Sequence, residues 1–160
     1  MHPSLHRSSS DLRSLNKHVH HDPFPIPNIS HILDNFANTA LYSTIDLCSG
    51  FLQMKVHPDD THKLAFSTYQ GHYEWLRAPF GLKNSPNSFQ RLMQLALAGL
   101  QPLQIACYID DIIVASTSSV DEHLKKLETV FKCLEKHRLK IKPSKCVFKS
   151  IDKYINKLFY

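Results

Sequence analysis

The chain has 160 residues, a formal net charge of +5 and a pI near 9.0. This length fits one domain or part of a larger one, and an apolar content of 42% is ordinary for a protein with a packed core. Basic charge favours a polyanionic partner, but it is also common in proteins without one. No apolar run is long enough to span a membrane, and the N-terminus lacks the apolar region of a secretory signal.

The four cysteines, Cys48, Cys107, Cys133 and Cys146, are widely spaced. None forms a Cys-x-x-Cys pair, so neither a zinc site nor a thioredoxin-like motif is indicated. We therefore expect a reducing, intracellular compartment. The sequence also has no G-x-G-x-x-G or Walker A loop, so dinucleotide binding and P-loop hydrolysis have no support.

The N-terminal residues 1–22 are polar and have no clear period. They are expected to form a loosely ordered lead, with a short strand or turn at about 11–17. His18, His20 and His21 in this lead are a candidate metal site, although a solvated histidine-rich loop explains them more simply. The three prolines that follow favour an extended segment, because proline fixes φ and restricts the residue before it.

Hydrophobic period and capping residues predict the elements that follow. Helices are expected at about 28–38, 85–99 and 118–137. Strands are expected at 41–47, 64–68, 72–76, 105–109, 112–115, 139–142 and 145–148, and a short mixed turn or strand at 51–56. Because helices alternate irregularly with prominent hairpins, the predicted class is α+β, with a largely antiparallel sheet flanked by helices.

The predicted helices have recognisable caps. The expected N-cap residues are Asn28 or Ser30, then Ser85, then Ser118 or Ser119. The last helix is expected to bury one apolar stripe, formed by Val120, Leu124, Leu127, Val130, Phe131 and Leu134.

The stretch Tyr108-Ile109-Asp110-Asp111 lies between two apolar, β-branched runs and predicts the tight turn of a hairpin. Carboxylates flanked by apolar strands are costly to desolvate, and a divalent cation commonly compensates them. Turn chemistry alone also explains the pair, since Asp is favoured in turns. Asp59-Asp60, in a polar connector, shows that an Asp pair is not diagnostic by itself. Asp46, near the end of a predicted strand, is a further candidate.

Three features occur together: Asp46 after a strand, a Pro-Phe-Gly-Leu-Lys-Asn-Ser-Pro loop that enters a helix, and Tyr-Ile-Asp-Asp in a hairpin. With them the chain resembles the reverse transcriptases of gypsy-type long-terminal-repeat retrotransposons, from about Asp11 to Phe148. The matching stretches are DLRSLNK, FPIP, TIDLCSGF, KVHPDDTHKLAF, GHYEWLRAPFGLKNSPNSFQRLM, YIDDIIVAS, EHLKKL and KPSKC.

The resemblance implies a polymerase palm with partial fingers. Residues 1–22 then hold the lead and a remnant fingers strand, and residues 23–160 the palm and fingers fragment. Within that fragment, fingers are expected at about 57–77 and palm at about 40–56 and 78–160. The implied activity is RNA-directed DNA polymerisation, with an RNA or DNA template, a primer and deoxynucleoside triphosphates as partners, and no membrane.

The same resemblance implies a metal site formed by Asp46, Asp110 and Asp111, which the backbone carbonyl of Leu47 completes. Two Mg²⁺ ions about 4 Å apart, or Mn²⁺ in their place, suit phosphoryl transfer and prefer oxygen ligands. Asp46 and Asp110 are the expected bridging ligands, and Asp111 is the supporting one.

Nucleotide contacts also follow from the resemblance. Phe51 stands at the position of the steric gate that excludes a 2′-hydroxyl; without the family it reads as a core aromatic residue. Phe80 and Gly81 match the loop that lines the nucleotide pocket.

Template and primer contacts follow in the same way. Arg13 and Asn16 match a template-contacting fingers motif, and Tyr108 is expected near the primer end. Lys142 and Lys145 are candidate phosphate contacts, although a solvated face explains them equally well.

The chain departs from the family pattern at several points. Leu12 stands where the family has an aromatic residue, Ala78 where it has Met, and Ile155-Asn156-Lys157 where it has a Leu-Gly-His turn. The basic fingers strands expected before DLRSLNK, and the thumb and ribonuclease H regions, do not match, so a truncated fragment is expected. The alternatives are an inert remnant that binds nucleic acid weakly at most, and an unrelated α+β binding protein. The expected location is the cytoplasm, in a retroelement particle, or the nucleus; the oligomeric state stays open.

Overall fold

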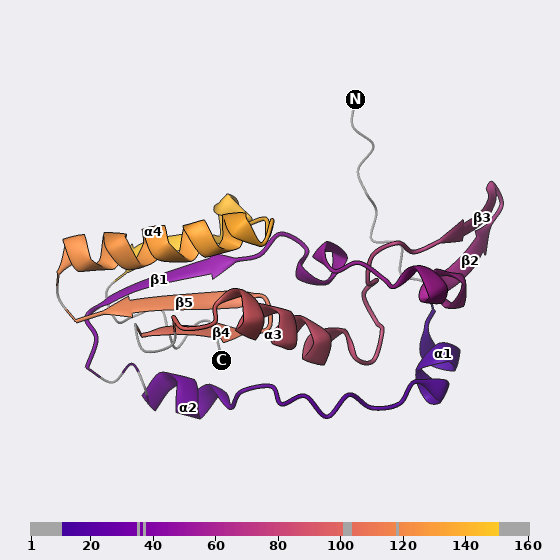
Figure 1. Ribbon diagram of the computed structural model, residues 1–160, viewed down its shortest axis with the longest axis horizontal. Helices are drawn as coiled ribbons and strands as arrows, with labels where there is room; N and C mark the ends of the chain where they lie inside the picture. Colours follow the sequence, from indigo (N-terminus) through magenta and orange to yellow (C-terminus); the bar gives the residue numbers. More distant parts are fainter. Residues whose placement is uncertain (1–10, 35, 37, 101–103, 118, 151–160) are drawn as a thin grey trace.

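The structure of the chain, a computed structural model, describes residues 11–34, 36, 38–100, 104–117 and 119–150. In these ranges a four-stranded sheet with its helices lies at one end of an elongated molecule (Figure 1). A two-stranded hairpin and a short helix lie at the other end. None of the helices in these ranges has the length and apolar character that a membrane crossing requires.

The elements follow one another in an irregular α and β order. The helices are α1 (Arg13–His18), α2 (Ile29–Asp34), α3 (Ser85–Ala96) and α4 (Val120–Lys136). The strands are β1 (Leu41–Asp46), β2 (Ala65–Thr68), β3 (Gly71–Glu74), β4 (Ile105–Tyr108), β5 (Asp111–Ser116) and β6 (Val147–Ser150). Short 3₁₀ helices are η1 (Gly50–Gln53), η2 (Pro58–Leu64) and η4 (Pro143–Lys145).

The strands of the larger sheet lie in the order β4-β5-β1-β6, and every neighbouring pair is antiparallel. β4 and β5 form the predicted local hairpin. β1 comes from much earlier in the chain and pairs with β5 from Leu41 opposite Ser116 to Asp46 opposite Asp111. This long-range register brings the two segments that carry the candidate carboxylates to one end of the sheet.

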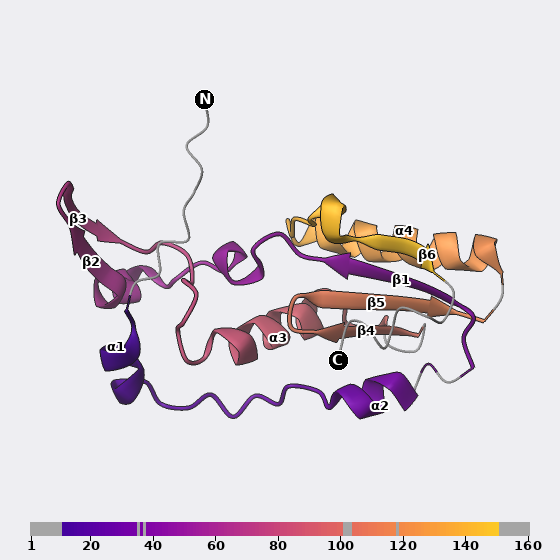
Figure 2. The same ribbon diagram turned by 180° about the vertical axis from the view of Figure 1, so that it is seen from behind.

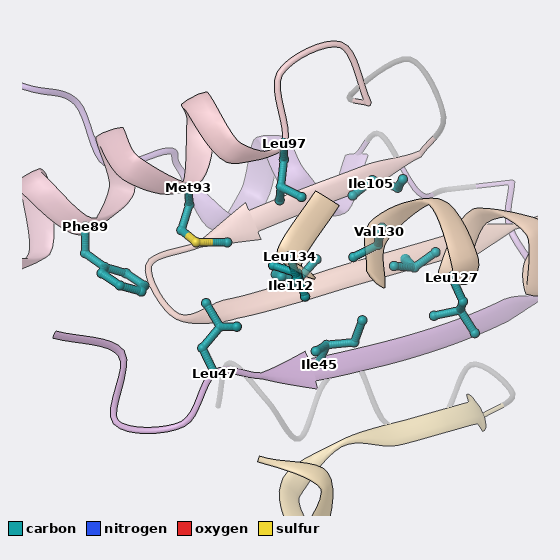
Figure 3. Close-up of a cluster of buried hydrophobic side chains, with 11 residues drawn as sticks. Ile45, Leu47, Phe89, Met93, Leu97, Ile105, Ile112, Leu127, Val130 and Leu134 are labelled. Carbon is teal, nitrogen blue, oxygen red and sulfur yellow. The ribbon is translucent and has the colours of Figure 1, made fainter. Parts of the chain in front are cut away.

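Two apolar clusters cover the two faces of this sheet. The larger one joins β1, β4 and β5 to α3 and α4 (Figure 3); its buried members are Ile45, Leu47, Phe89, Met93, Leu97, Ile105, Ile112, Val114, Leu127, Val130 and Leu134. The smaller one packs α2 on the other face and contains Ile32, Phe36, Tyr42, Ile113 and Ala115. Burial of one large apolar side chain stabilises a fold by about 1.5–3 kcal/mol. The larger cluster therefore fixes α3 firmly against the β4–β5 hairpin.

The hairpin β2–β3 lies beside α1, away from the larger sheet (Figure 2). Phe66 stacks on Tyr73 with ring centroids 5.8 Å apart and lies 5.6 Å from the ring of Trp75. Tyr69, at the turn, is 96% exposed. The hairpin is thus held by its own aromatic contacts and presents its tip to solvent.

The predicted α+β class, both hairpins and the helices expected near residues 28, 85 and 118 are present. The N-terminal lead is a correction: residues 13–18 form helix α1, and residues 11–22 contain no strand. Residues 1–10 and the predicted Ile155-Asn156-Lys157 departure lie outside the described residues.

Several boundaries also differ from the prediction. The N-cap of α3 is Asn84, and Ser85 is its first residue. The predicted mixed turn or strand at 51–56 is present as the 3₁₀ turn η1 and a single bridge between Lys55 and Arg77. Proline has no N–H for a ladder hydrogen bond, so residues 143–145 form η4 and the last strand begins only at Val147.

The buried face of α4 is more polar than predicted. Val120 and Leu124 are 40% and 56% exposed, whereas His123 and Lys126 are buried. His123 contacts hydroxyls on both central strands: Nε2 lies 2.8 Å from Ser43 Oγ, and Nδ1 lies 3.0 Å from the hydroxyl of the serine that ends β5. Polar groups satisfied in this way are tolerated under a helix.

Candidate active site

The three candidate carboxylates meet where β1 ends and the β4–β5 turn begins. Asp46 closes β1, and its Cα partner across the ladder is Asp111. Asp110 lies in the turn between β4 and β5, and its carbonyl accepts a hydrogen bond of 3.1 Å from the N–H of Leu47. The sheet register therefore brings together residues that are far apart in the sequence, as the resemblance implied.

The turn next to these aspartates has a strained backbone, and hydrogen bonds from α3 hold it in place. Ile109 has φ +56°, in the left-handed region that a β-branched residue rarely adopts. Its N–H donates a 2.7 Å hydrogen bond to Oε1 of Gln90, whose Nε2 donates to the carbonyl of Cys107 at 3.2 Å. Gln90 lies on α3 and is 1% exposed. One amide side chain thus holds the turn in this conformation, and the sequence analysis had assigned Gln90 no role.

Gly50 is a second residue that the sequence analysis missed. It is buried next to the turn, and an added Cβ would lie 2.9 Å from Cβ of Asp110 and 3.3 Å from the ring of Phe89. Only glycine lets the chain after β1 pass this close to Asp110. The Ser49-Gly50 pair that follows β1 is the signal that the sequence offers for this close approach.

The carboxylates of the turn are held in an environment that disfavours their charge. Burial raises the pKa of Asp110, and the charge of Asp46 raises it further. Burial and the charges of Asp110 and Asp46 together raise the pKa of Asp111 to about 6. The ammonium of Lys145 acts in the opposite direction on both groups. The cluster therefore carries negative charge that the protein only partly neutralises.

Lys145 reaches this cluster from η4. Its Nζ lies 3.0 Å from Oδ2 of Asp46, whose side chain is 17% exposed. Lys142, the other lysine predicted to contact phosphate, is exposed.

The donor groups at this site fit a hard divalent cation, since Mg²⁺ prefers carboxylate and carbonyl oxygens. Raised carboxylate pKa values also indicate charge that a cation would relieve. In the part of the chain that the structure describes, however, no three His, Cys, Asp or Glu side chains are arranged to hold a metal ion as they stand. Asp46 is instead engaged by Lys145.

The predicted nucleotide-contacting residues lie on the adjoining loops. Phe51, in η1, is half-buried between Phe80 and Phe89, with ring centroids 5.7 and 5.9 Å away. Phe80 is 47% exposed, and the adjacent Gly81 has φ +91° and is exposed. The structure therefore brings Phe51 and Phe80 together: the ring of Phe80 is exposed, and the ring of Phe51 packs on its neighbours.

The predicted template-contacting residues are engaged within the chain. Asn16 donates to the carbonyl of Gly81 at 2.8 Å and accepts from the N–H of Lys83 at 2.8 Å, so it ties α1 to the nucleotide loop. Arg13 is exposed and pairs with Asp11 at 2.7 Å. Tyr108, at the end of β4, is half-buried beside the smaller cluster.

Comparison with known proteins agrees with this geometry. The family described as "Reverse transcriptase (RNA-dependent DNA polymerase)" matches residues 2–156. The chain belongs to the reverse transcriptase family. Among relatives, the retrovirus-related Pol polyproteins of the Drosophila melanogaster transposons 297 and 412 are 44% and 42% identical to it. Each match covers 86% of this chain and 13% or 11% of the relative, so the chain spans about an eighth of their length.

Solved reverse transcriptase structures are similar as well. A foamy viral protease-reverse transcriptase in complex with double-stranded DNA matches with a TM-score of 0.81 and 33% identity, over 88% of this chain and 24% of that one. The same viral protein in complex with an RNA/DNA hybrid matches with a TM-score of 0.78 and 33% identity, over 86% and 18%. The predicted family and the predicted fold, a partial palm with an antiparallel sheet flanked by helices, are confirmed.

Proposed function

We propose that this chain is the carboxylate-bearing part of an RNA-directed DNA polymerase, which adds deoxynucleotides to the 3′ end of a primer. The observation that carries the proposal is the meeting of Asp46, Asp110 and Asp111 at one end of the sheet, with the pKa values of both turn carboxyls raised. Perturbed carboxylates in a polar, accessible turn are typical of functional sites. Membership of the reverse transcriptase family gives the reaction type.

The groups that would hold two Mg²⁺ or Mn²⁺ ions are the carboxylates of Asp46, Asp110 and Asp111 and the carbonyl of Leu47. When bound, such ions neutralise the triphosphate and lower the pKa of the attacking 3′-hydroxyl. The chain's own part is to orient the three carboxylates and hold them next to one another. Gln90 contributes by fixing the turn that carries two of them.

Phe51 is proposed as the steric gate under the sugar. Its ring contacts the fully buried ring of Phe89 and the ring of Phe80, with centroids 5.9 and 5.7 Å away. A ring held in this way cannot swing aside easily, so it would exclude a 2′-hydroxyl by contact. Phe80 and Gly81, on the exposed loop, are the proposed lining of the nucleotide pocket.

The proposed partners are an RNA or DNA template with its primer and deoxynucleoside triphosphates. The foamy viral relatives in complex with double-stranded DNA and with an RNA/DNA hybrid support nucleic acid as the partner. Arg13, Asn16 and Tyr108 remain proposed template and primer contacts. Lys142 and Lys145 remain proposed phosphate contacts.

We further propose that residues 57–77 are fingers and that residues 40–56 and 78–160 are palm. The separate β2–β3 hairpin supports this division. An intracellular setting, cytoplasmic or nuclear, belongs to the same proposal and is supported by the free state of all four cysteines.

The test is primer extension on an RNA template with Mg²⁺ and deoxynucleotides, comparing the wild type with Asp110→Asn. A lost metal ligand removes several kcal/mol of transition-state stabilisation, so extension should fall by about a thousandfold or more. Asp59→Asn, an exposed Asp of the other pair, is the matched control and should keep wild-type extension. Undiminished extension by Asp110→Asn would refute the site. No extension by the wild type would favour the alternative, an inert remnant.

A further inference from the structure

Lys145 lies at the proposed metal site because its segment is fastened to β1. The N–H of Lys142 donates to the carbonyl of Asp46 at 2.8 Å, and Ile141 forms a bridge with Leu47. Residues 143–145 then make the single turn of η4, which ends with Lys145. The backbone therefore fixes where the Lys145 side chain starts, directly over the end of β1.

The side chain of Lys145 ends on Asp46, with Nζ 3.0 Å from Oδ2. Its positive charge also lowers the pKa of Asp110 and of Asp111, by electrostatic attraction and without a described hydrogen bond to either. Its ammonium thus supplies positive charge to all three carboxylates from one position. A divalent cation bound by the same carboxylates would supply positive charge to the same place.

We propose that Lys145 is a displaceable counter-cation of this site: its ammonium holds the Asp46 carboxylate in the metal-free chain and leaves it when a divalent cation binds. The inference rests on the proposed function, since it takes Asp46 to be a metal ligand. It assigns Lys145 a positioning role through Asp46, separate from any contact with phosphate.

Two features of the pair make displacement easy. Lysine presents a compact point charge on a flexible stem, so it releases a carboxylate more readily than the bidentate fork of arginine does. The Lys145 side chain is also 58% exposed, so its ammonium moves into water without a large desolvation change. Asp46, whose side chain is 17% exposed, is the less exposed member of the pair and keeps a cationic partner in either state.

The experiment is a titration of the full chain with Mn²⁺ alone. Binding is measured by calorimetry and by the electron paramagnetic resonance signal of free Mn²⁺. It is run at pH 8, above the pKa of about 6 of Asp111. The variants are Lys145→Met, Lys145→Arg, the exposed control Lys142→Met, and Asp110→Asn. Because an exposed ion pair no longer has to be broken, Lys145→Met should bind Mn²⁺ about two- to fivefold more tightly than the wild type.

Lys145→Arg should restore wild-type affinity or weaken it, because a guanidinium keeps the pair with Asp46. Lys142→Met should bind like the wild type, and Asp110→Asn should bind much more weakly. If Lys145→Met binds Mn²⁺ with unchanged or lower affinity while binding still depends on Asp110, Lys145 is not a displaceable partner and the inference is overturned. If wild type and Lys145→Met both fail to bind Mn²⁺, the proposed metal site and this inference fall together.

Discussion

The two hydrogen bonds by which Gln90 holds the β4–β5 turn can be tested by mutation. Replacing Gln90 by leucine roughly keeps the side-chain volume on α3. It removes the acceptor for Ile109 N–H and the donor to Cys107 C=O. Each polar group left unpaired costs about 1–3 kcal/mol when buried, and here both are only partly buried. Ile109 can then leave its left-handed conformation, and the release of this backbone strain offsets part of the loss in stability. We expect Gln90→Leu to lower the free energy of unfolding by about 2–3 kcal/mol.

The assay is urea unfolding at equilibrium, with the slope against urea required to stay constant. Gln94→Leu is the matched control, since it makes the same substitution one turn further along α3 at an exposed position. Amide hydrogen exchange at Ile109 should accelerate in Gln90→Leu and stay unchanged in Gln94→Leu. A loss below about 0.5 kcal/mol in Gln90→Leu would refute the view that this amide holds the turn.

Three further predictions concern the same end of the sheet. Gly50→Ala should lower the free energy of unfolding by about 1–3 kcal/mol, because its Cβ meets Asp110 at 2.9 Å; wild-type urea stability would contradict the close approach. The stabilisation that Asp111 itself contributes should fall as pH rises from about 4 to 6, because its folded pKa, about 6, lies above its ordinary value of 3.8. The contribution is fully present below pH 4 and lost through pH 6, so Asp111→Asn should flatten that part of a denaturation profile; an unchanged slope would count against the raised pKa. Phe51→Ala should relax discrimination against ribonucleotides in single-nucleotide incorporation, and unchanged selectivity would remove the gate role.

The buried face of α4 could not be predicted correctly from its apolar period alone. The apolar period placed Leu124 in the stripe, but the structure exposes it and buries His123 and Lys126. The helix has the expected length, and Ser119 caps it as predicted, accepting from Glu122 N–H at 3.3 Å. What the pattern lacked was the partner surface. The carbonyl of Ala115 accepts from Lys126 Nζ, and the hydroxyl of Ser43, 80 residues away in the sequence, hydrogen-bonds with His123.

Helix α1 was missed for a similar reason. It has six residues, no side-chain cap and no buried residue, so its local sequence carries little helical signal. Its position depends on Asn16, which bonds a loop more than sixty residues away.

The candidate site was predicted unevenly. The three aspartates were proposed from the Tyr-Ile-Asp-Asp turn and the strand Asp. The register of β1 on β5 brings them to one end of the sheet, and their role as metal ligands stays a prediction. Gln90 and Gly50 were not proposed, because a buried amide and a glycine reveal their roles only once α3 and η1 are packed against the turn.

The register of β1 on β5 has a consequence for how the site forms. The β4–β5 hairpin joins neighbouring segments and closes a short loop, whereas β1 must find β5 across a long stretch of chain that includes β2, β3 and α3. Loop closure over long separations is entropically costly and slow. Asp110 and Asp111 are therefore placed early, and Asp46 arrives only when the non-local ladder closes. If the proposed metal site exists, recovery of metal binding during refolding should follow formation of the whole sheet, not of the hairpin.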